Sequence, residues 1–317
     1  MYEIHIRSSA ITRLGVSLGV DIIPLKTCTF DCVYCQLGVT KNKTIDRQAF
    51  VSKANVLNEL KEALNVEANR IDFVTFSGSG EPTLNSEIGE MIEQVKAFTN
   101  VPIAVLTNGS LLYRYDVRKD LCKADLVVPS FDAITEDTFL RVNRPHKSLK
   151  LEMIIEGLRI FSQEFQGKIW LEIMLVRNIN DDINELKYLA DLIQDIKLNK
   201  IHLNTVVRPP VEEFALSVTR EEMINIANLF DERVEIVADF DKIVDHKIHA
   251  NSEFIKDQIV PLLKRRPCTV DDIATSLGIH INEVIKYVNH LIENGLIRQL
   301  RSDNKWYYEI SKQKEDF

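Results

Sequence analysis

Cys28-Thr-Phe-Asp-Cys32-Val-Tyr-Cys35 is the stretch of sequence that decides how the rest of this chain is interpreted. Three thiolates this close in sequence can ligate three corners of a cubane [4Fe–4S] cluster from one loop, whereas ferredoxin-type clusters use four thiolates. The two other cysteines, Cys122 and Cys268, are far away in sequence. The spacing therefore predicts a cluster with one iron left open for a further ligand.

Two other interpretations of the cysteines remain open at this point. A zinc site needs a fourth ligand, and it usually pairs C-x2-C with a second pair of ligands well downstream. The cysteines could also be unrelated buried or redox-active residues. Neither alternative accounts for the crowding of three cysteines on one short segment as directly as a cluster does.

The composition is that of an ordinary globular protein, with 317 residues, 45% of them hydrophobic and 27% charged. This length predicts one large domain or a large domain followed by a small one. No apolar run approaches the length of a transmembrane helix, and no secretory signal is visible. Five cysteines, three of them crowded together, do not form a disulfide framework, so we expect a cytoplasmic protein without membrane contact.

The net charge of −8 argues against binding of nucleic acid over the whole surface, although it leaves room for a local basic site.

Short apolar runs alternate with segments of helical periodicity between about residues 15 and 240. The predicted strands are Gly19–Ile23, Phe73–Phe76, Ile103–Leu106, Leu126–Pro129, Ile169–Leu175, Ile201–Asn204 and Val234–Ala238. Such alternation predicts parallel strands with right-handed crossovers. We expect an α/β fold with an open or partial (β/α) barrel, and a doubly wound sheet is the alternative. In a barrel the chemistry lies in the loops at the carboxyl ends of the strands.

The pattern changes after residue 240. Three helices are predicted at Ser252–Lys264, Thr269–Leu277 and Ile281–Glu293, followed by a hairpin made of Leu296–Leu300 and Trp306–Ile310. This order is typical of a winged helix-turn-helix domain. We therefore predict a barrel domain over residues 1–240, a linker over 241–250 and a small C-terminal winged-helix domain over 251–317.

The cysteine loop, with Tyr34 just before its third cysteine, resembles that of the radical S-adenosylmethionine (SAM) superfamily. In that superfamily the open iron binds the amino and carboxylate groups of SAM. Reductive cleavage then yields methionine and a 5′-deoxyadenosyl radical that takes a hydrogen atom from the substrate. The resemblance implies that Cys28, Cys32 and Cys35 ligate the cluster and that Tyr34 lies at the cofactor.

Ser77-Gly78-Ser79-Gly80-Glu81-Pro82 follows the second predicted strand and resembles the superfamily's Gly-Gly-Glu-Pro motif, which contacts the SAM amino group. Glycines let a backbone approach a ligand closely, and a carboxylate accepts hydrogen bonds from an ammonium group. Ser79 departs from the motif. The resemblance implies SAM contacts by Gly78, Gly80 and Glu81.

Polar residues also follow the later strands, where related enzymes place further SAM contacts. The candidates are Asn108, Ser130, Asp132, Arg177 and Asn204. Asn108 precedes Gly109, and an Asn-Gly pair is first of all a turn signal. The others could equally lie in simple exposed loops.

Asn143-Arg144-Pro145-His146 is a compact polar cluster. Arg144 could bind a carboxylate or phosphate through its planar fork, and His146 could transfer a proton near neutral pH. Alternatively, these four residues could simply mark the end of a helix before Pro145. With Arg208, these two residues are our candidates for substrate contacts in catalysis.

Several segments narrow the resemblance to the Fe–S oxidoreductase group that is similar to the wyosine-type tRNA-modifying synthases. They include Arg13–Asp21, Phe131–Ala133 and the Asn143–His146 cluster, and the resemblance covers roughly residues 8–215. The tRNA-modifying members carry additional N-terminal cysteines for a second cluster, and no cysteine precedes Cys28 here.

We therefore expect a radical SAM enzyme with a [4Fe–4S] cluster and SAM as cofactors and an RNA, a peptide or a metabolite as substrate. Its partners would be a reductant such as flavodoxin or ferredoxin, and RNA, DNA or a peptide at the winged helix. One alternative is an Fe–S redox sensor that regulates transcription through the winged helix. Another is a tRNA-modifying radical SAM enzyme that uses the winged helix to bind RNA.

Overall fold

The computed structural model describes residues 5–11, 14–67, 71–207, 210–240, 259–263, 266–277, 281–302 and 305–311. The chain divides into two compact units. The first comprises residues 1–34, 39–207 and 212–243, and the second comprises 35–38, 208–211 and 244–317. Among the described residues, no helix is long and apolar enough to cross a membrane. The predicted linker at 241–250 lies outside the described residues.

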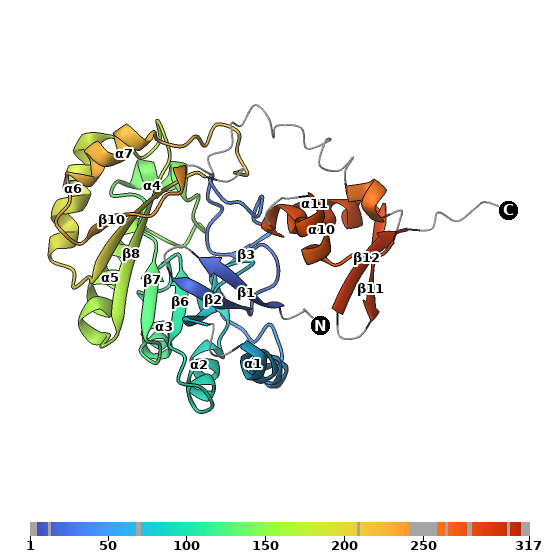
Figure 1. Cartoon of the computed structure of the whole chain (residues 1–317). Helices are drawn as coiled ribbons and strands as arrows, with labels where there is room; N and C mark the ends of the chain where they lie inside the picture. Colours follow the sequence, from blue (N-terminus) through green and yellow to red (C-terminus); the bar gives the residue numbers. More distant parts are fainter. Residues whose placement is uncertain are drawn as a thin grey trace. The chain divides into compact units, whose positions relative to one another are not determined.

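The first unit is built on one eight-stranded sheet (Figure 1). Its strands, in spatial order, are β1 (His5–Ile11), β2 (Gly15–Asp21), β5 (Phe73–Phe76), β6 (Ile103–Thr107), β7 (Leu126–Pro129), β8 (Lys168–Leu175), β9 (Lys200–Thr205) and β10 (Val234–Ile236). Only β1 is antiparallel to its neighbour, and the seven strands from β2 to β10 pair in parallel. Because spatial order follows chain order and β10 does not close on β1, the predicted open α/β sheet is confirmed and the doubly wound alternative is wrong.

One strand of the eight-stranded sheet, β1, was missed by the sequence patterns, as were the two-residue strands β3 (Thr27–Cys28) and β4 (Asn42–Lys43) outside it. β1 pairs over its whole length with β2, which begins at Gly15 rather than at the predicted Gly19. Gly15 has φ +71°, and a Cβ there would lie 2.2 Å from Asp72 Oδ2, which accepts a hydrogen bond from Val16 N. The hairpin therefore depends on a contact with the start of β5 that no local pattern reveals.

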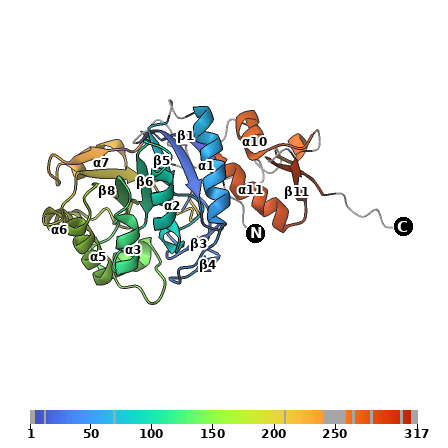
Figure 2. The ribbon, with the colours of Figure 1, turned by 90° about the horizontal axis from the view of Figure 1, so that it is seen from below.

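Helices alternate with the strands and cover the outer face of the sheet, as Figure 2 shows from a second direction. They are α1 (Lys53–Glu67), α2 (Ile88–Lys96), α3 (Tyr115–Leu121), α4 (Glu136–Val142), α5 (Leu151–Glu164), α6 (Ile183–Gln194) and α7 (Arg220–Ala227). Their apolar residues recur at helical spacing and are buried, as with Ile88, Met91 and Val95 on α2. A capping box of Thr219 and Glu222 begins α7.

The two faces of the sheet differ in what they bury. The large core lies between the sheet and the helices. On the opposite, inner face a much smaller apolar cluster contains Leu14, Ala104, Leu126 and Val128. Farther along the strands the inner face carries polar residues, and these lead to the loops that hold the candidate site.

The described part of the second unit contains α10 (Val270–Leu277), α11 (Ile281–Glu293) and a hairpin of β11 (Ile297–Ser302) and β12 (Lys305–Ile310). The second and third predicted helices and the hairpin are thus confirmed as elements. Most of the predicted helix Ser252–Lys264 lies outside the described residues. Thr269 and Asp272 exchange hydrogen bonds of a capping box, and a separate core includes Cys268, Val288 and Tyr308.

Gly157 lies inside α5 because the helix packs directly on a neighbouring backbone. A Cβ at Gly157 would be 2.4 Å from Tyr113 N and 2.6 Å from Leu112 C. Glycine costs about 1 kcal/mol relative to alanine inside a helix, so propensity alone would favour alanine here. The close backbone contact therefore explains the glycine.

We predict that Gly157→Ala lowers the free energy of unfolding by about 1–3 kcal/mol, because overpacking outweighs the gain in helix propensity. Thermal unfolding of the purified variant measures this. Gln163→Ala, at an exposed position of the same helix, is the control and should shift the midpoint little. A rise in the midpoint for Gly157→Ala would contradict the packing argument.

Candidate active site

The three clustered cysteines lie on a loop with little regular structure, next to the carboxyl ends of the parallel strands. β3 (Thr27–Cys28) makes a short parallel pairing with β4 (Asn42–Lys43), and the remaining loop follows. Cys28, Cys32 and Cys35 are half-buried and not disulfide-bonded. The backbone of such a loop needs hydrogen-bond partners from elsewhere.

The loop after β5 supplies the partners at the start of the cysteine loop. Lys26 N donates to Ser79 O at 2.7 Å, and Glu81 N donates to Thr27 O at 3.1 Å. A Cβ on Gly80 would lie 1.9 Å from Thr27 O, so no residue larger than glycine fits between the two backbones. The glycine expected to admit a ligand therefore also admits the backbone just before Cys28.

Ser79, the departure from the motif, has a defined function in the loop. Its backbone N–H donates to Asp21 Oδ2 at 3.0 Å, and its hydroxyl donates to the same oxygen. Gly78, at φ +132°, leaves the space that Asp21 fills, since a Cβ there would be 2.4 Å from Asp21 Cγ. The end of β2 and the loop after β5 are thereby tied together.

Glu81 is buried and acts as a cross-link between two strand-end loops. Its Oε1 accepts from Thr83 N, Thr83 Oγ1 and Thr107 Oγ1, at 3.0, 2.5 and 2.6 Å, and its Oε2 accepts from Asn108 N at 2.7 Å. Burial raises the pKa of Glu81, and these hydrogen bonds oppose the rise. The carboxylate thus joins the ends of β5 and β6.

The segment after α4 supplies the partners farther along the cysteine loop. Three backbone hydrogen bonds join them: His146 N to Thr29 O at 2.8 Å, Asp31 N to Asn143 O at 3.0 Å, and Val33 N to Val142 O at 3.0 Å. The Asn143–His146 cluster does follow the end of a helix, as one alternative expected. It also binds the cysteine loop along its length.

Two carboxamides donate toward the cysteine sulfurs. Asn108 Nδ2 lies 3.5 Å from Cys28 Sγ and 2.7 Å from Thr29 Oγ1. Asn143 Nδ2 lies 3.5 Å from Cys32 Sγ and 2.8 Å from Asp132 Oδ2. N–H groups directed at thiolates stabilise negative charge on sulfur. The side chains of Asn108 and Asn143 can therefore donate to the sulfurs of a metal-bound cysteine loop.

Asp132 is buried among hydrogen-bond donors. Tyr34 Oη donates to its Oδ2 at 2.5 Å, and Met174 N donates to its Oδ1 at 2.9 Å. Burial raises the pKa of Asp132 to about 6, while the hydrogen bonds oppose the rise. Burial, with the nearby carboxylate of Asp132, also raises the pKa of Tyr34 well above its ordinary value.

The structure brings most of the predicted cofactor residues together. Asn108, Ser130 and Asp132 line one narrow cavity with Asn143 and Phe30. Tyr34 joins this group through Asp132, and Gly78, Gly80 and Glu81 lie on the loop that binds residues 26–27. These residues thus surround the cysteine loop from three neighbouring strand ends.

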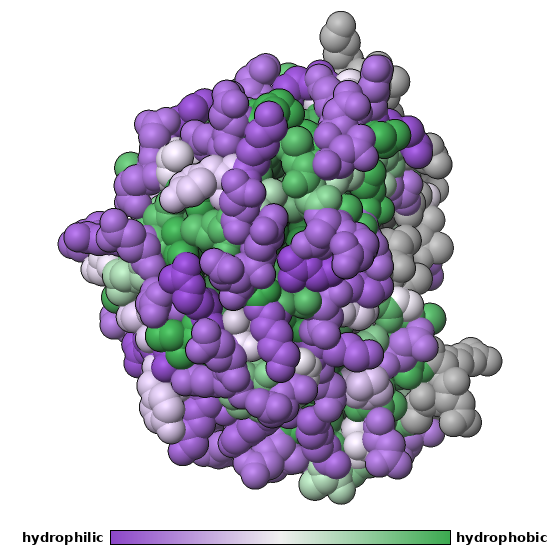
Figure 3. All heavy atoms as spheres, turned by 90° about the vertical axis from the view of Figure 1, so that its left-hand side faces the viewer, coloured by the Kyte–Doolittle hydropathy of each residue, from purple (hydrophilic) through white to green (hydrophobic). Residues whose placement is uncertain are grey.

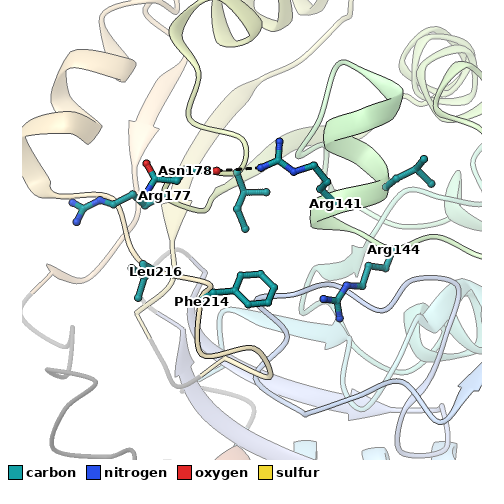
Figure 4. Close-up of a pocket in the computed structure, with 8 residues that line it drawn as sticks. Arg141, Arg144, Arg177, Asn178, Phe214 and Leu216 are labelled. Carbon is teal, nitrogen blue, oxygen red and sulfur yellow. Dashed lines mark hydrogen bonds between the residues drawn. The ribbon is translucent and has the colours of Figure 1, made fainter.

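The other predicted site residues that the structure describes have hydrogen-bond or ion-pair partners outside this group. Asn204, at the end of β9, donates to Glu172 Oε1 at 2.9 Å. The guanidinium of Arg177 donates to Glu222 Oε2 at 2.7 Å and points away from the other labelled residues (Figure 4). Arg144 pairs with Glu212, and His146 Nδ1 accepts from Ser148 N at 3.3 Å. Arg208 lies outside the described residues.

Three further residues support the site although none of them was among the predicted site residues. They are Asp21, Asn143 and Asn180. Asn180 Nδ2 donates to Asp132 O and Met174 O, both at 2.8 Å, and its Oδ1 accepts from Val176 N at 2.7 Å. The only signal in the sequence was their position beside predicted site residues.

The donor set fits a cluster better than a single metal ion. Within the described ranges, no three His, Cys, Asp or Glu side chains are grouped as ligands of one ion. A cubane cluster holds its thiolates on separate irons, so its sulfur ligands do not converge on one point. Three half-buried thiols on one loop, two of them facing carboxamide donors, suit such a group.

Comparison with known families gives a match over residues 22–193 to the model of the radical SAM superfamily. A UPF0026 protein of Methanocaldococcus jannaschii is 32% identical, over 93% of this chain and 92% of its own length. A protein of Brachyspira hyodysenteriae named GTPase Obg is 37% identical over 90% of this chain, which spans only 42% of that longer protein.

Solved structures share the fold at low identity. TYW1 with a bound lysine-pyruvate adduct superposes with a TM-score of 0.53 and 20% identity, over 69% of this chain and 74% of that chain. A radical SAM methyltransferase from Sphaerobacter thermophilus gives a TM-score of 0.55 and 17% identity, over 70% of this chain and 66% of that chain. Such identities support the partial-barrel fold alone.

We predict that Glu81→Gln destabilises the protein by about 1–3 kcal/mol, because the new amide N–H₂ would face a buried hydrogen-bond donor that Glu81 now accepts from. Thermal unfolding of the metal-free protein measures the loss. The control is Glu90→Gln, at an exposed carboxylate on α2, which should leave the midpoint nearly unchanged. Equal midpoints for the two variants would show that Glu81 is not a structural cross-link.

Proposed function

Since the chain belongs to the radical SAM superfamily, we propose that it uses the 5′-deoxyadenosyl radical to abstract a hydrogen atom from a substrate bound at the carboxyl ends of its strands. Members of this superfamily are enzymes that bind a [4Fe–4S] cluster and SAM. When bound, the cluster supplies the electron that cleaves SAM reductively. The protein's own residues bind, orient and shield these groups.

The proposal rests on the observation that three cysteines share one loop while the other two cysteines lie elsewhere in the chain. Cys122 ends α3, a helix that runs back from the carboxyl ends of the strands, so it lies toward the opposite edge of the sheet. Cys268 is buried in the separate core of the second unit. Cys28, Cys32 and Cys35 would hold three irons and leave the fourth open for SAM.

The surrounding residues would have distinct tasks. Asn108 and Asn143 would donate to the sulfurs of Cys28 and Cys32. The close approach of Gly80 to Thr27 would fix the backbone on which SAM rests. Phe30 and Phe139, packed edge to face with ring centroids 5.5 Å apart, would exclude water from this side of the loop.

We further propose that the C-terminal elements form a winged-helix domain that binds a macromolecular partner or substrate. α10 and α11 followed by a two-stranded hairpin support this assignment. A flavodoxin or ferredoxin would be the electron donor. Substrate contacts by His146 and Arg208 remain part of the proposal.

We predict that the anaerobically reconstituted protein, given SAM and dithionite, forms 5′-deoxyadenosine. Cys32→Ala should abolish formation of this product and should lose about four bound iron atoms per chain, the content of one [4Fe–4S] cluster. Liquid chromatography of the products and iron analysis measure these quantities. Cys122→Ala, at an exposed cysteine outside the loop, is the matched control and should retain both.

The same assay separates the alternatives. A redox sensor would carry the cluster but form no more 5′-deoxyadenosine than Cys32→Ala, and that result would overturn the proposal. A tRNA-modifying enzyme would form the product and would also copurify with RNA that is lost on neutralising Arg301. Indifference of RNA retention to that change would count against a tRNA substrate.

We predict that Asn143→Leu lowers the reduction potential of the cluster by about 40 mV, because one hydrogen bond to sulfur of about 1 kcal/mol favours the more negative, reduced state. Potentiometric titration followed by electron paramagnetic resonance measures the shift. Asn184→Leu, at an exposed position in the first turn of α6, is the control. An unchanged potential would show that Asn143 does not act on the cluster.

A further inference from the structure

A pocket of about 580 Å³ is lined entirely by residues of the first unit (Figure 4). It lies between the end of α4, the turn after β8 and the chain after β9. Its walls include Leu140, Arg141, Arg144, Asn178, Phe214 and Leu216. None of our sequence predictions treated these residues as one site.

The charged side chains that line the pocket are all arginines, and each pairs with a carboxylate just outside the lining: Arg141 with Asp137, Arg144 with Glu212 and Arg177 with Glu222. Arg177 is turned away toward Glu222, which leaves Arg141 and Arg144 facing the pocket. Arg141 donates to Asn178 O at 3.2 Å, and Arg144 donates to Glu212 Oε1 at 2.5 Å. A guanidinium has five N–H groups, so each arginine has donors left for a ligand.

The pocket is also unusually apolar for an exposed surface. Leu140, Phe214 and Leu216 are 54%, 52% and 38% exposed, and all three belong to its walls. Single exposed apolar residues are common, and Figure 3 shows hydrophobic side chains scattered among hydrophilic ones on another view of the surface. Three around one arginine-lined pocket indicate a ligand with an apolar part.

The backbone at two positions of the wall is in an uncommon conformation. Arg144 has φ +46° and Asn178 has φ +61°. Asparagine adopts this left-handed region readily, whereas arginine adopts it at a cost. A strained residue persists where the surrounding structure holds it, and such residues are enriched at functional sites. The conformation of Arg144 aims its side chain toward Phe214, with the guanidinium carbon 6.0 Å from the ring centroid.

The pocket shares its wall with the segments that hold the cysteine loop. Arg144 directly follows Asn143, whose amide lies 3.5 Å from Cys32 Sγ. Glu212, the partner of Arg144, donates its backbone N–H to Val33 O at 3.3 Å. A molecule bound by Arg144 is therefore held by the same chain segments that fix the reacting centre.

We propose that this pocket binds the substrate of the reaction, and that the substrate joins a carboxylate or phosphate group to a flat, unsaturated body. The planar forks of Arg141 and Arg144 match the oxygens of such an anion. The exposed face of Phe214 stacks on the flat body, as aromatic residues do with heteroaromatic rings. This inference rests on the proposed radical SAM function, because it assigns the substrate site of that reaction.

The test uses phenyl phosphate and benzoate as anionic probes and benzyl alcohol as the neutral control. Binding to the reconstituted full-length protein, without reductant, is titrated by saturation-transfer NMR. We expect the anions to bind and benzyl alcohol not to bind, and the tighter of the two anions identifies phosphate or carboxylate as the preferred group. Arg141→Gln with Arg144→Gln should weaken binding about tenfold or more. Phe214→Leu should weaken it less, and Arg159→Gln, at a partly exposed arginine on α5 that does not line the pocket, should leave it unchanged.

Two results would overturn the inference. One is binding that is equal for the neutral probe or indifferent to the double arginine change, in variants whose thermal midpoints match that of the parent. The other is full displacement of phenyl phosphate by saturating SAM, which would assign the pocket to SAM itself. Because no step of this test needs SAM cleavage, its failure is distinct from a failure to form 5′-deoxyadenosine.

Discussion

The hydrogen bonding of the cysteine loop to the segments around it is the constraint on which the candidate site depends. The loop has almost no regular structure, so its backbone groups cannot satisfy one another. The loop after β5 and the segment after α4 satisfy them from two sides, and Gly80 is present because only its lack of a Cβ permits the contact with Thr27 O. The backbone around Cys28 and Cys32 is therefore held by distant parts of the chain.

The same region buries carboxylates without cationic partners among their described contacts. Glu81 and Asp132 are surrounded by N–H and O–H donors instead, and burial raises the pKa of both. Buried acids in this setting cost free energy unless each oxygen is matched by donors in fixed positions. The hydrogen bonds to Glu81 and Asp132 therefore connect the strand-end loops to one another.

The four residues that follow α4, Asn143–His146, contact both the cysteine loop and the proposed substrate pocket. Their backbone binds the cysteine loop, Asn143 donates toward Cys32 Sγ, and Arg144 faces the proposed substrate pocket. Since Glu212 joins both Arg144 and Val33, a ligand that competes for Arg144 acts on groups bonded to the loop. The proposed substrate pocket and the cysteine loop are thus linked through Glu212 by direct hydrogen bonds.

The sequence by itself determined the parts of this protein that depend on local patterns. Apolar runs located β5 and β7 to the residue, and three cysteines in one short run identified the family. Only the tertiary structure decided what surrounds those cysteines. Asn143 reaches Cys32 across 111 residues, Glu81 turns inward to Asn108, and Arg177 turns outward to Glu222. A hydrogen bond between distant segments depends on how the strand ends are packed together, and no periodicity in the chain encodes the direction of a single side chain.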